Sequence, residues 1–231
     1  AAATRHFSAG VLLPISEAST RAILPCRFAL RPCLIPFASA ETFAAVSDKS
    51  CVLVAASRLG IDVPRHRLLR SRADLVPMME NLHFPVVVKP ARSVADSGST
   101  RLKLGASHAR DQAALNEVID QTPLEAYPVL VQERVIGPGI GVFVLLWDGE
   151  LRAAFAHRRI REKPPSGGVS VLSESIPLDP ELLARSVALL RDFNWRGVAM
   201  VEYKIDERTG IPYLMEINGR FWGSLQLAID S

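Results

Sequence analysis

Apolar and polar residues alternate most clearly near the end of the chain, in the segment MVEYKIDERTGIPYLMEINGRFWG at residues 200–223. Two runs with a period of two, 198–205 and 211–217, enclose a polar stretch, and this pattern predicts a β-hairpin. Gly210 can adopt the left-handed conformation that such a turn requires. We therefore expect two antiparallel strands joined through residues 206–210.

This hairpin is expected to bring three oxygen-bearing side chains to one face. Glu216 and Asn218 are two residues apart and point the same way. Glu202 lies opposite Glu216 if the loop runs from 206 to 212, and one diagonal step away if the loop ends at Gly210. Both loops have odd lengths. We expect an odd loop, because an even one would turn Glu202 to the other face.

The convergence of these side chains indicates a cation site. Two close carboxylates, Glu202 and Glu216, repel each other unless a cation lies between them, so at least one should have a raised pKa without metal. Oxygen-only ligands suit a hard ion such as Mg²⁺. The alternative is a surface hairpin with solvated acids, but the apolar residues around Glu216 argue against it.

The same patterns predict further elements. Unbroken β-branched residues at 86–88 indicate a strand with both faces covered. Other strands are expected at 101–104, 127–135, 141–147, 151–160 and 169–176. Helices are expected at 17–24, 41–59, 72–81, 108–121 and 180–193. Short strands at 11–15 and 34–37, on either side of the first helix, suggest a piece of a parallel α/β layer.

Composition limits the class of protein. The chain has 231 residues, 48% of them apolar, and a net charge of +3, which argues against nucleic acid as the main partner. No apolar run reaches the length of a membrane span. Three cysteines without metal spacing indicate reduced thiols and a cytoplasmic protein. Because the chain starts with Ala and stops after an apolar stretch, we expect a fragment truncated at both ends.

Glu202, together with Glu216-x-Asn218-x-Arg220, resembles the metal-binding end of the ATP-grasp superfamily. The string EINGRFWGSLQLA is similar to uncharacterised members of the carboxylate–amine ligase type, and FPVVVKP is a second strong match. The resemblance implies an α/β fold with two lobes, preceded by a truncated Rossmann-like segment. It divides the chain into a remnant of the preceding domain at 1–62, a small lid lobe at 63–134 and a large lobe at 135–231.

The resemblance also implies roles for particular residues. Metal ligands would be Glu202, Glu216 and Asn218, and Arg220, Arg159 and Arg161 would act near the transferred phosphate. Nucleotide contacts would come from Lys49, Lys89, a flap with Ser97, Gly98 and Ser99, and a hinge with Glu133, Arg134 and Val135. Lys89 is expected to point into the cleft on the same side as Glu133. Taken one at a time, these lysines and arginines also suit solvated positions, and the flap and hinge suit ordinary loops.

The implied activity is an ATP- and Mg²⁺-dependent ligase, with Mn²⁺ as an alternative ion, that joins a small carboxylic acid to an amine through an acyl-phosphate. Such catalysis relies on positioning and electrostatics rather than on a protein nucleophile. The alternatives are a regulatory ATP-binding module and a related enzyme that uses a thiol or bicarbonate. A nucleic-acid-binding role ranks last, and no membrane partner is expected. The sequence does not specify the acid, the acceptor or the oligomeric state.

Overall fold

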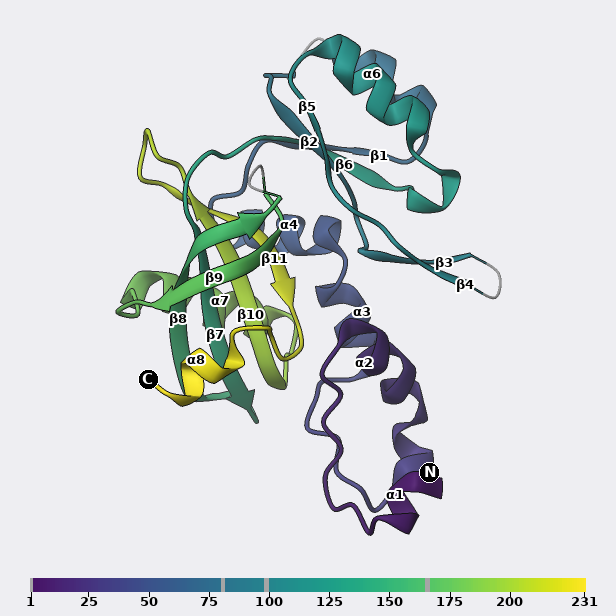
Figure 1. Cartoon of the computed structure of the whole chain (residues 1–231), viewed down its shortest axis with the longest axis vertical. Coiled ribbons are helices and arrows are strands. Elements are labelled where there is room, and N and C mark those ends of the chain that lie inside the picture. Colours follow the sequence, from purple (N-terminus) through teal and green to yellow (C-terminus); the bar gives the residue numbers. More distant parts are fainter. Residues whose placement is uncertain (1, 80–81, 98–99, 165–166) are drawn as a thin grey trace.

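The structure is a computed structural model that describes residues 2–79, 82–97, 100–164 and 167–231. It has two main antiparallel sheets with helices packed on them, which confirms the predicted mixed α/β fold (Figure 1). None of the helices among the described residues combines the length and the apolar character needed to cross a membrane. The division into 1–62, 63–134 and 135–231 stays a prediction.

The N-terminal part is mostly helical. Its elements are α1 (Ala2–His6), α2 (Glu17–Ile23), the 3-10 helix η1 (Leu24–Leu30), α3 (Ala40–Val46) and α4 (Lys49–Arg58). The strands predicted at 11–15 and 34–37 are reduced to one parallel bridge between Val11 and Leu34. A Rossmann-like layer is therefore absent from the described residues of this part.

A four-stranded sheet follows, with the order β1-β6-β2-β5. Its strands are β1 (His66–Leu69), β2 (Val86–Pro90), β5 (Ser107–Ala109) and β6 (Val129–Glu133). Its helical segments are η2 (Arg72–Asp74), α5 (Leu75–Met78), α6 (Gln112–Gln121) and η4 (Leu124–Ala126). A separate two-stranded hairpin consists of β3 (Val94–Ser97) and β4 (Thr100–Lys103).

The C-terminal half forms a five-stranded sheet with the order β11-β10-β7-β8-β9. Its strands are β7 (Gly139–Trp147), β8 (Glu150–Lys163), β9 (Val169–Ser175), β10 (Gly197–Ile205) and β11 (Pro212–Asn218). Helices α7 (Pro180–Asp192) and α8 (Leu225–Ile229) complete it. Helix α7 begins as predicted: the Asp179 carboxylate accepts hydrogen bonds from two backbone N–H groups, and Pro180 follows it.

Two predicted helices were wrong in their extent. The expected helix 41–59 is broken at Ser47, and Asp48 starts α4 by accepting hydrogen bonds from the N–H groups of Ser50 and Cys51. An Asp in the middle of an apolar pattern acts here as an N-cap. The expected helix 108–121 begins later, because residues 107–109 pair with β2 and Asp111 caps α6.

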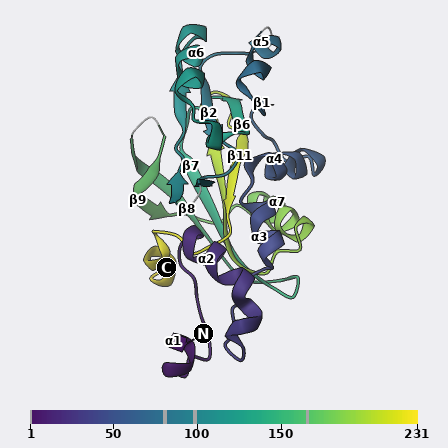
Figure 2. The same ribbon diagram turned by 90° about the vertical axis from the view of Figure 1, so that its right-hand side faces the viewer.

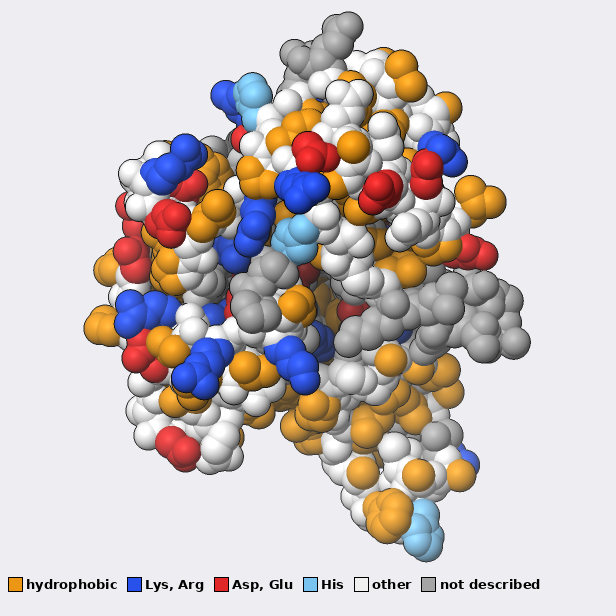
Figure 3. All heavy atoms as spheres, turned by 45° about the horizontal axis from the view of Figure 1, so that its top comes forward, with side chains coloured by type: hydrophobic (Ala, Val, Ile, Leu, Met, Phe, Trp, Pro, Cys, Tyr) orange, Lys and Arg blue, Asp and Glu red, His pale blue; other side chains and the backbone are white. Residues whose placement is uncertain are grey.

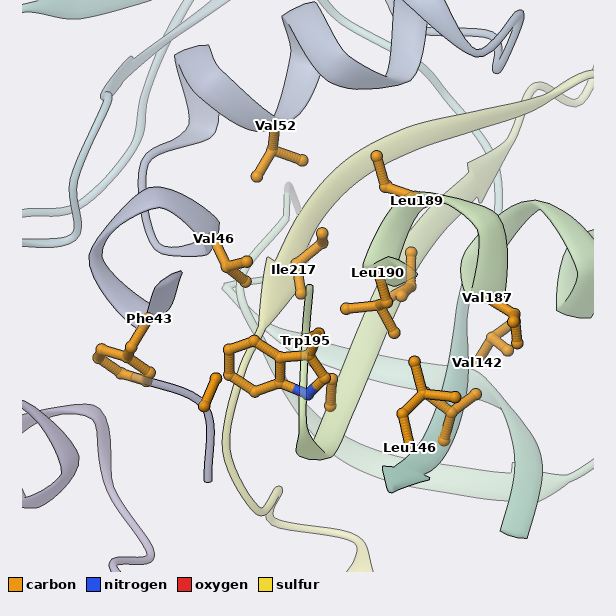
Figure 4. Packing of buried hydrophobic residues seen from close by; sticks show 14 of the residues in the cluster. Phe43, Val46, Val52, Val142, Leu146, Val187, Leu189, Leu190, Trp195 and Ile217 are labelled. Carbon is orange, nitrogen blue, oxygen red and sulfur yellow. The ribbon is translucent and has the colours of Figure 1, made fainter. Parts of the chain in front are cut away.

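The core consists of two separate apolar clusters. The larger lies where α3, α4 and α7 cover one face of the five-stranded sheet, with Phe43, Val52, Leu190, Trp195 and Ile217 interdigitated (Figure 4). The smaller lies between the four-stranded sheet and its helices α5 and α6. Viewed from the side, α3, α4 and α7 lie on one side of the larger sheet (Figure 2). Its other face is left for the polar side chains described next.

Candidate functional site

The β10–β11 hairpin pairs Glu202 directly with Glu216, which confirms the expected register. The expected odd loop is wrong, because Ile205 pairs with Pro212 and leaves an even connection, 206–211. A regular ladder from that loop would place Glu202 opposite Met215 instead. A β-bulge at Met215 supplies one extra residue and restores the pairing of the two glutamates.

The bulge also decides which side chains share a face. Residues on the two sides of a bulge can point the same way, and both Met215 and Glu216 line the same pocket. Leu214 and Ile217 instead pack into the larger apolar cluster. On β10, Glu202 lines the pocket while Val201 is buried in that cluster. The hairpin thus has one apolar face, which packs on the larger cluster, and one polar face, which lines the pocket.

Each of the three candidate metal ligands contacts a different cation. An Arg159 Nη2–H donates to the Glu202 carboxylate. Lys49 Nζ lies 3.4 Å from Glu216 Oε2. Arg220 Nη2 donates to Asn218 Oδ1 over 3.1 Å, while the Asn218 amide donates to Glu216 Oε1 over 3.0 Å. The Asn218 amide is thus held beside Glu216, and strand pairing places Glu202 next to Glu216.

The donor set fits a hard divalent cation that keeps other oxygen ligands. The described residues contain no cluster of three or more His, Cys, Asp or Glu side chains suited to a metal ion. Here two carboxylates and one amide oxygen converge, which is too few for a closed protein cage. Mg²⁺ typically takes one or two carboxylates together with phosphates and water. The set therefore suits Mg²⁺ that also binds a phosphate-bearing ligand.

A pocket of about 690 Å³ surrounds this site and lies between the two main sheets. Its lining includes Lys49, Lys89, Arg134, Val135 and Arg159, as the sequence predicted for ligand contacts. This volume is typical of small-molecule sites. Basic side chains flank the central hollow on the face shown in Figure 3. The pocket therefore suits an anionic ligand.

The two glutamates have opposite pKa shifts. Burial raises the pKa of Glu202 above its usual range, and the neighbouring Glu216 raises it further against the effect of Arg159. Burial would also raise the pKa of Glu216, but Lys49 and Lys89 outweigh it and hold that pKa below its usual range. The expectation of one raised carboxyl pKa is confirmed, and Glu202 is the residue that carries it.

Lys89 is a half-buried cation beside these acids. Burial lowers its pKa to about 8, and the repulsion of Lys49 contributes, while Glu216 and Glu202 oppose the shift. Its strand neighbours Val86 and Val88 face the smaller apolar cluster, so Lys89 points the opposite way, into the pocket. An ammonium with little water around it is well placed to contact a phosphate.

Glu133 does not share this side of the sheet. It pairs with Val86, whose side chain is buried in the smaller cluster, and its Oε1 lies 2.9 Å from His83 Nδ1. The expectation that Lys89 and Glu133 face the same way is wrong. Gln132 faces the pocket instead, opposite Val87, and no described residue forms a hydrogen bond with its Oε1. The strand alternation was visible in the sequence, but not which face is covered.

Other residues predicted for the site are not found among the described lining residues of the pocket. Arg161 is exposed and is not among the described pocket residues, whereas Glu162, next in the chain, lines the pocket. Ser97 belongs to β3 and pairs with Thr100. Gly98 and Ser99 lie outside the described residues. Of the three arginines expected near the phosphate, Arg159 reaches the carboxylates of Glu202 and Glu162, and Arg220 contacts Asn218.

Sequence reasoning also missed two histidines of the pocket. His108 lines it from β5, and burial together with Arg134 and Lys204 lowers its pKa. His157 lines it from β8 and is 3% exposed. A period-two reading of β8 places His157 and Arg159 on one face, so that signal was available.

The chain is similar in sequence to known ligases. None of the protein-family models matches the chain. The D-alanine–D-alanine ligase of Polaromonas sp. strain JS666 is 28% identical over 177 residues, which cover 69% of this chain and 49% of that protein. The chain therefore spans about half the length of this curated relative.

Solved structures show the same fold. The L-amino acid ligase from Bacillus licheniformis has a TM-score of 0.72 and 17% identity, covering 98% of this chain and 52% of that one. Biotin carboxylase from Campylobacter jejuni, in complex with an ATP analogue, has a TM-score of 0.78 and 16% identity, with the same two coverages, 98% and 52%. The sequence relatives and the shared fold agree with the resemblance to the ATP-grasp superfamily.

Proposed function

We propose that this chain carries the ATP site of a Mg²⁺-dependent ligase that joins a carboxylic acid to an amine. The observation that supports this most directly is the pairing of Glu202 with Glu216 on one face, with Asn218 beside them and cations around them. A regulatory nucleotide-binding module would have no need for two carboxylates paired at this position, one buried and one half-buried. The sequence relatives include ligases of amino acids, which points to the same class of reaction.

The proposed reaction has two steps. A carboxylate oxygen of the acid attacks the γ-phosphorus of ATP, and the bond from that phosphorus to the β,γ-bridging oxygen breaks. The products are ADP and an acyl-phosphate. The amine nitrogen then attacks the acyl carbon, the carbon–oxygen bond to phosphate breaks, and the nitrogen loses a proton to water. An amide and inorganic phosphate result.

The main barrier to the first step is electrostatic, because an acid and a triphosphate repel each other. Glu202, Glu216 and Asn218 would hold Mg²⁺, which offsets phosphate charge when bound. Lys89 and Lys49 lie where they can contact phosphate oxygens, and Arg159 and Arg220 add two planar donor groups. No side chain is required to form a covalent intermediate.

Phosphate release from ATP, measured across a panel of amino acids and other amines, tests this function. Glu216→Gln should abolish acid-dependent turnover, because it removes a metal ligand while keeping the size of the side chain. Glu133→Gln is the matched control, since that carboxylate contacts His83 away from the pocket. An active Glu216→Gln protein would contradict the proposal. So would a wild-type chain whose melting temperature does not respond to Mg²⁺ and ATP together.

A further inference from the structure

A row of residues crosses the five-stranded sheet on its pocket face. The register pairs Glu216 with Glu202, Glu202 with Gly141, and Gly141 with His157. Paired residues of neighbouring strands place their side chains on the same face. The glutamates and the histidine are therefore separated only by a glycine, which has no side chain to lie between them.

Gly141 is required for the position of the histidine. A Cβ atom at residue 141 would lie 2.8 Å from His157 Nε2 and 2.8 Å from Phe143 Cζ. Contacts this short do not occur between unbonded atoms of these types, so the imidazole lies over the glycine backbone. Nε2 therefore lies over Gly141, the residue between His157 and Glu202 in this row.

His157 is fixed in place but incompletely bonded. Its Nδ1 lies 2.9 Å from Ser224 Oγ, and its ring packs edge-on against Phe143 with centroids 4.7 Å apart. Its Nε2 is buried and has no hydrogen-bond partner within the part of the chain that the structure describes. A buried polar atom without a hydrogen-bond partner destabilises the empty protein. A ligand that bonds Nε2 would remove this destabilisation.

The imidazole is held neutral. Burial lowers the pKa of His157 to about 4, and the positive charge of Arg159 lowers it further. A neutral histidine with Nδ1 accepting from a hydroxyl carries its proton on Nε2 and donates from there. Such a neutral donor can polarise an acyl oxygen without adding a full charge.

The wall next to His157 is uncharged. Trp222 packs on Phe143 at a tilt, with ring centroids 4.1 Å apart, and its buried indole N–H has no hydrogen-bond partner among the described residues. The described lining residues of β9 and of the segment after Trp222 are apolar, serine or glycine, and include Leu172 and Leu227. Among the described residues, two buried ring nitrogens, His157 Nε2 and Trp222 Nε1, are left unpaired beside this apolar surface. It suits one carboxyl group attached to a bulky apolar group, and a second charge would be left unpaired there.

We propose that His157, which is fixed by Ser224 and lies over Gly141, binds a carboxyl oxygen of the acid substrate. We also propose that Trp222 selects acids with an apolar or aromatic substituent. This inference rests on the proposed ligase function, because the acid must lie beside the metal and phosphate site. His157 is the group that touches the substrate, and Ser224 is a positioning residue that sets its tautomer.

The test uses the whole 231-residue chain labelled with ¹⁵N in its histidines. The His157 resonances, assigned by their loss in His157→Gln, should show a neutral ring with the proton on Nε2. Adding 3-phenylpropanoate should shift them at concentrations where acetate and succinate do not. His157→Phe should weaken binding of this probe about tenfold or more, because the ligand then loses its donor. His157→Gln, whose amide can donate from a similar position, should retain most of the affinity.

The controls separate this proposal from others. His66→Gln changes a histidine whose Nδ1 lies 2.9 Å from the Pro64 carbonyl oxygen, outside the pocket, and should leave probe binding unchanged. If His157→Phe lowers the melting temperature, the comparison of wild type with His157→Gln and Ser224→Ala still reports the tautomer and the affinity. A proton on Nδ1, equal binding of succinate, or undiminished probe binding by His157→Phe would overturn the acid site.

If the chain is not a ligase, the result of these experiments would be different. In that case Mg²⁺ and ATP together would fail to raise the melting temperature of the wild-type chain, whatever the acid probe does. A chain that responds to Mg²⁺ and ATP but not to 3-phenylpropanoate would keep the nucleotide site and lose the acid site proposed here.

Discussion

At the scale of single residues, the site depends on charges that are buried next to one another. Lys89 is the clearest case, because its ammonium lies beside Glu216 and Glu202 but also beside Lys49. Burial destabilises the charged form of Lys89 more than the two carboxylates stabilise it, so the pKa of Lys89 falls to about 8. The protein therefore holds a lysine whose charge changes within a few pH units of neutrality.

Binding of ATP should weaken as the pH rises through about 8. The ammonium form of Lys89 is the form that attracts phosphate, and it is lost above its lowered pKa. Lys89→Ala should bind ATP weakly at every pH and remove this dependence. Calorimetric titration with ATP and Mg²⁺ from about pH 6.5 to about pH 9.5 measures it.

The free energy of unfolding should rise with pH over part of the range in which ATP binding weakens. The unfolded chain binds the Lys89 proton more tightly, since its pKa there is the ordinary 10.5. The free energy of unfolding should therefore rise with pH between about 8 and about 10.5 through this residue. Lys163 is an exposed lysine on β8, so Lys163→Ala is the control and should keep this pH dependence. Unchanged ATP affinity in Lys89→Ala, with a large fall in melting temperature, would show that Lys89 is structural.

At the scale of elements, the β10–β11 hairpin is the part that positions the metal ligands. Its connection of even length would turn Glu216 out of line with Glu202 in a regular ladder. The bulge at Met215 corrects this and keeps both side chains facing the pocket. Met215 itself is buried, and its sulfur lies 3.8 Å from the Gln132 amide. One inserted residue thus sets the register and also contacts the other sheet.

Deleting Met215 should preserve the pairing of Glu202 with Glu216. The ladder on either side of the bulge already pairs Tyr203 with Leu214 and Glu202 with Glu216, so the deletion makes it regular. Loss of a buried Met side chain should still cost about 2 kcal/mol of unfolding free energy. The stabilisation by Mg²⁺ and ATP, read as a rise in melting temperature, should survive.

Deleting Ile217 is the matched comparison for this prediction. It removes one residue between Glu216 and Asn218, and therefore turns the asparagine toward the apolar core. The response to Mg²⁺ and ATP should disappear. If both deletions abolish the response equally, the bulge has a role beyond register.

At the scale of the whole molecule, two apolar clusters lie on the two sides of the pocket. A few polar contacts join their elements. The Lys49 N–H donates to the Ala91 carbonyl over 2.8 Å, Lys49 Nζ donates to Ser93 Oγ over 2.9 Å, and Arg92 pairs with Asp48. A ligand in the pocket would contact residues of both sheets. Ligand binding is therefore expected to couple the two parts.

Calorimetric unfolding should show this coupling. Without ligand, two separate cores should give two overlapping transitions rather than one sharp transition. Mg²⁺ with ATP at about 100 times the dissociation constant should add about 2.7 kcal/mol and bring the transitions together. Mg²⁺ alone and ATP alone should each have a smaller effect. A single sharp transition whose width does not change with ligand would contradict this prediction.

Local patterns in the sequence determined much of this protein. Strand alternation placed Glu216 and Asn218 on one face, the Asp179–Pro180 pair marked the start of α7, and the β-branched run predicted β2. These features depend on neighbouring residues, so a sequence contains them directly. The resemblance to the ATP-grasp superfamily rests on the same short strings.

The tertiary structure decided what depends on distant parts of the chain. Which face of β6 is covered, and hence whether Gln132 or Glu133 faces the pocket, follows from packing of the smaller cluster. The bulge at Met215 is needed because Leu214 and Ile217 must both stay buried in the larger cluster while Glu216 faces the pocket. Burial and pairing across strands are non-local, and alternation along one strand does not reveal them.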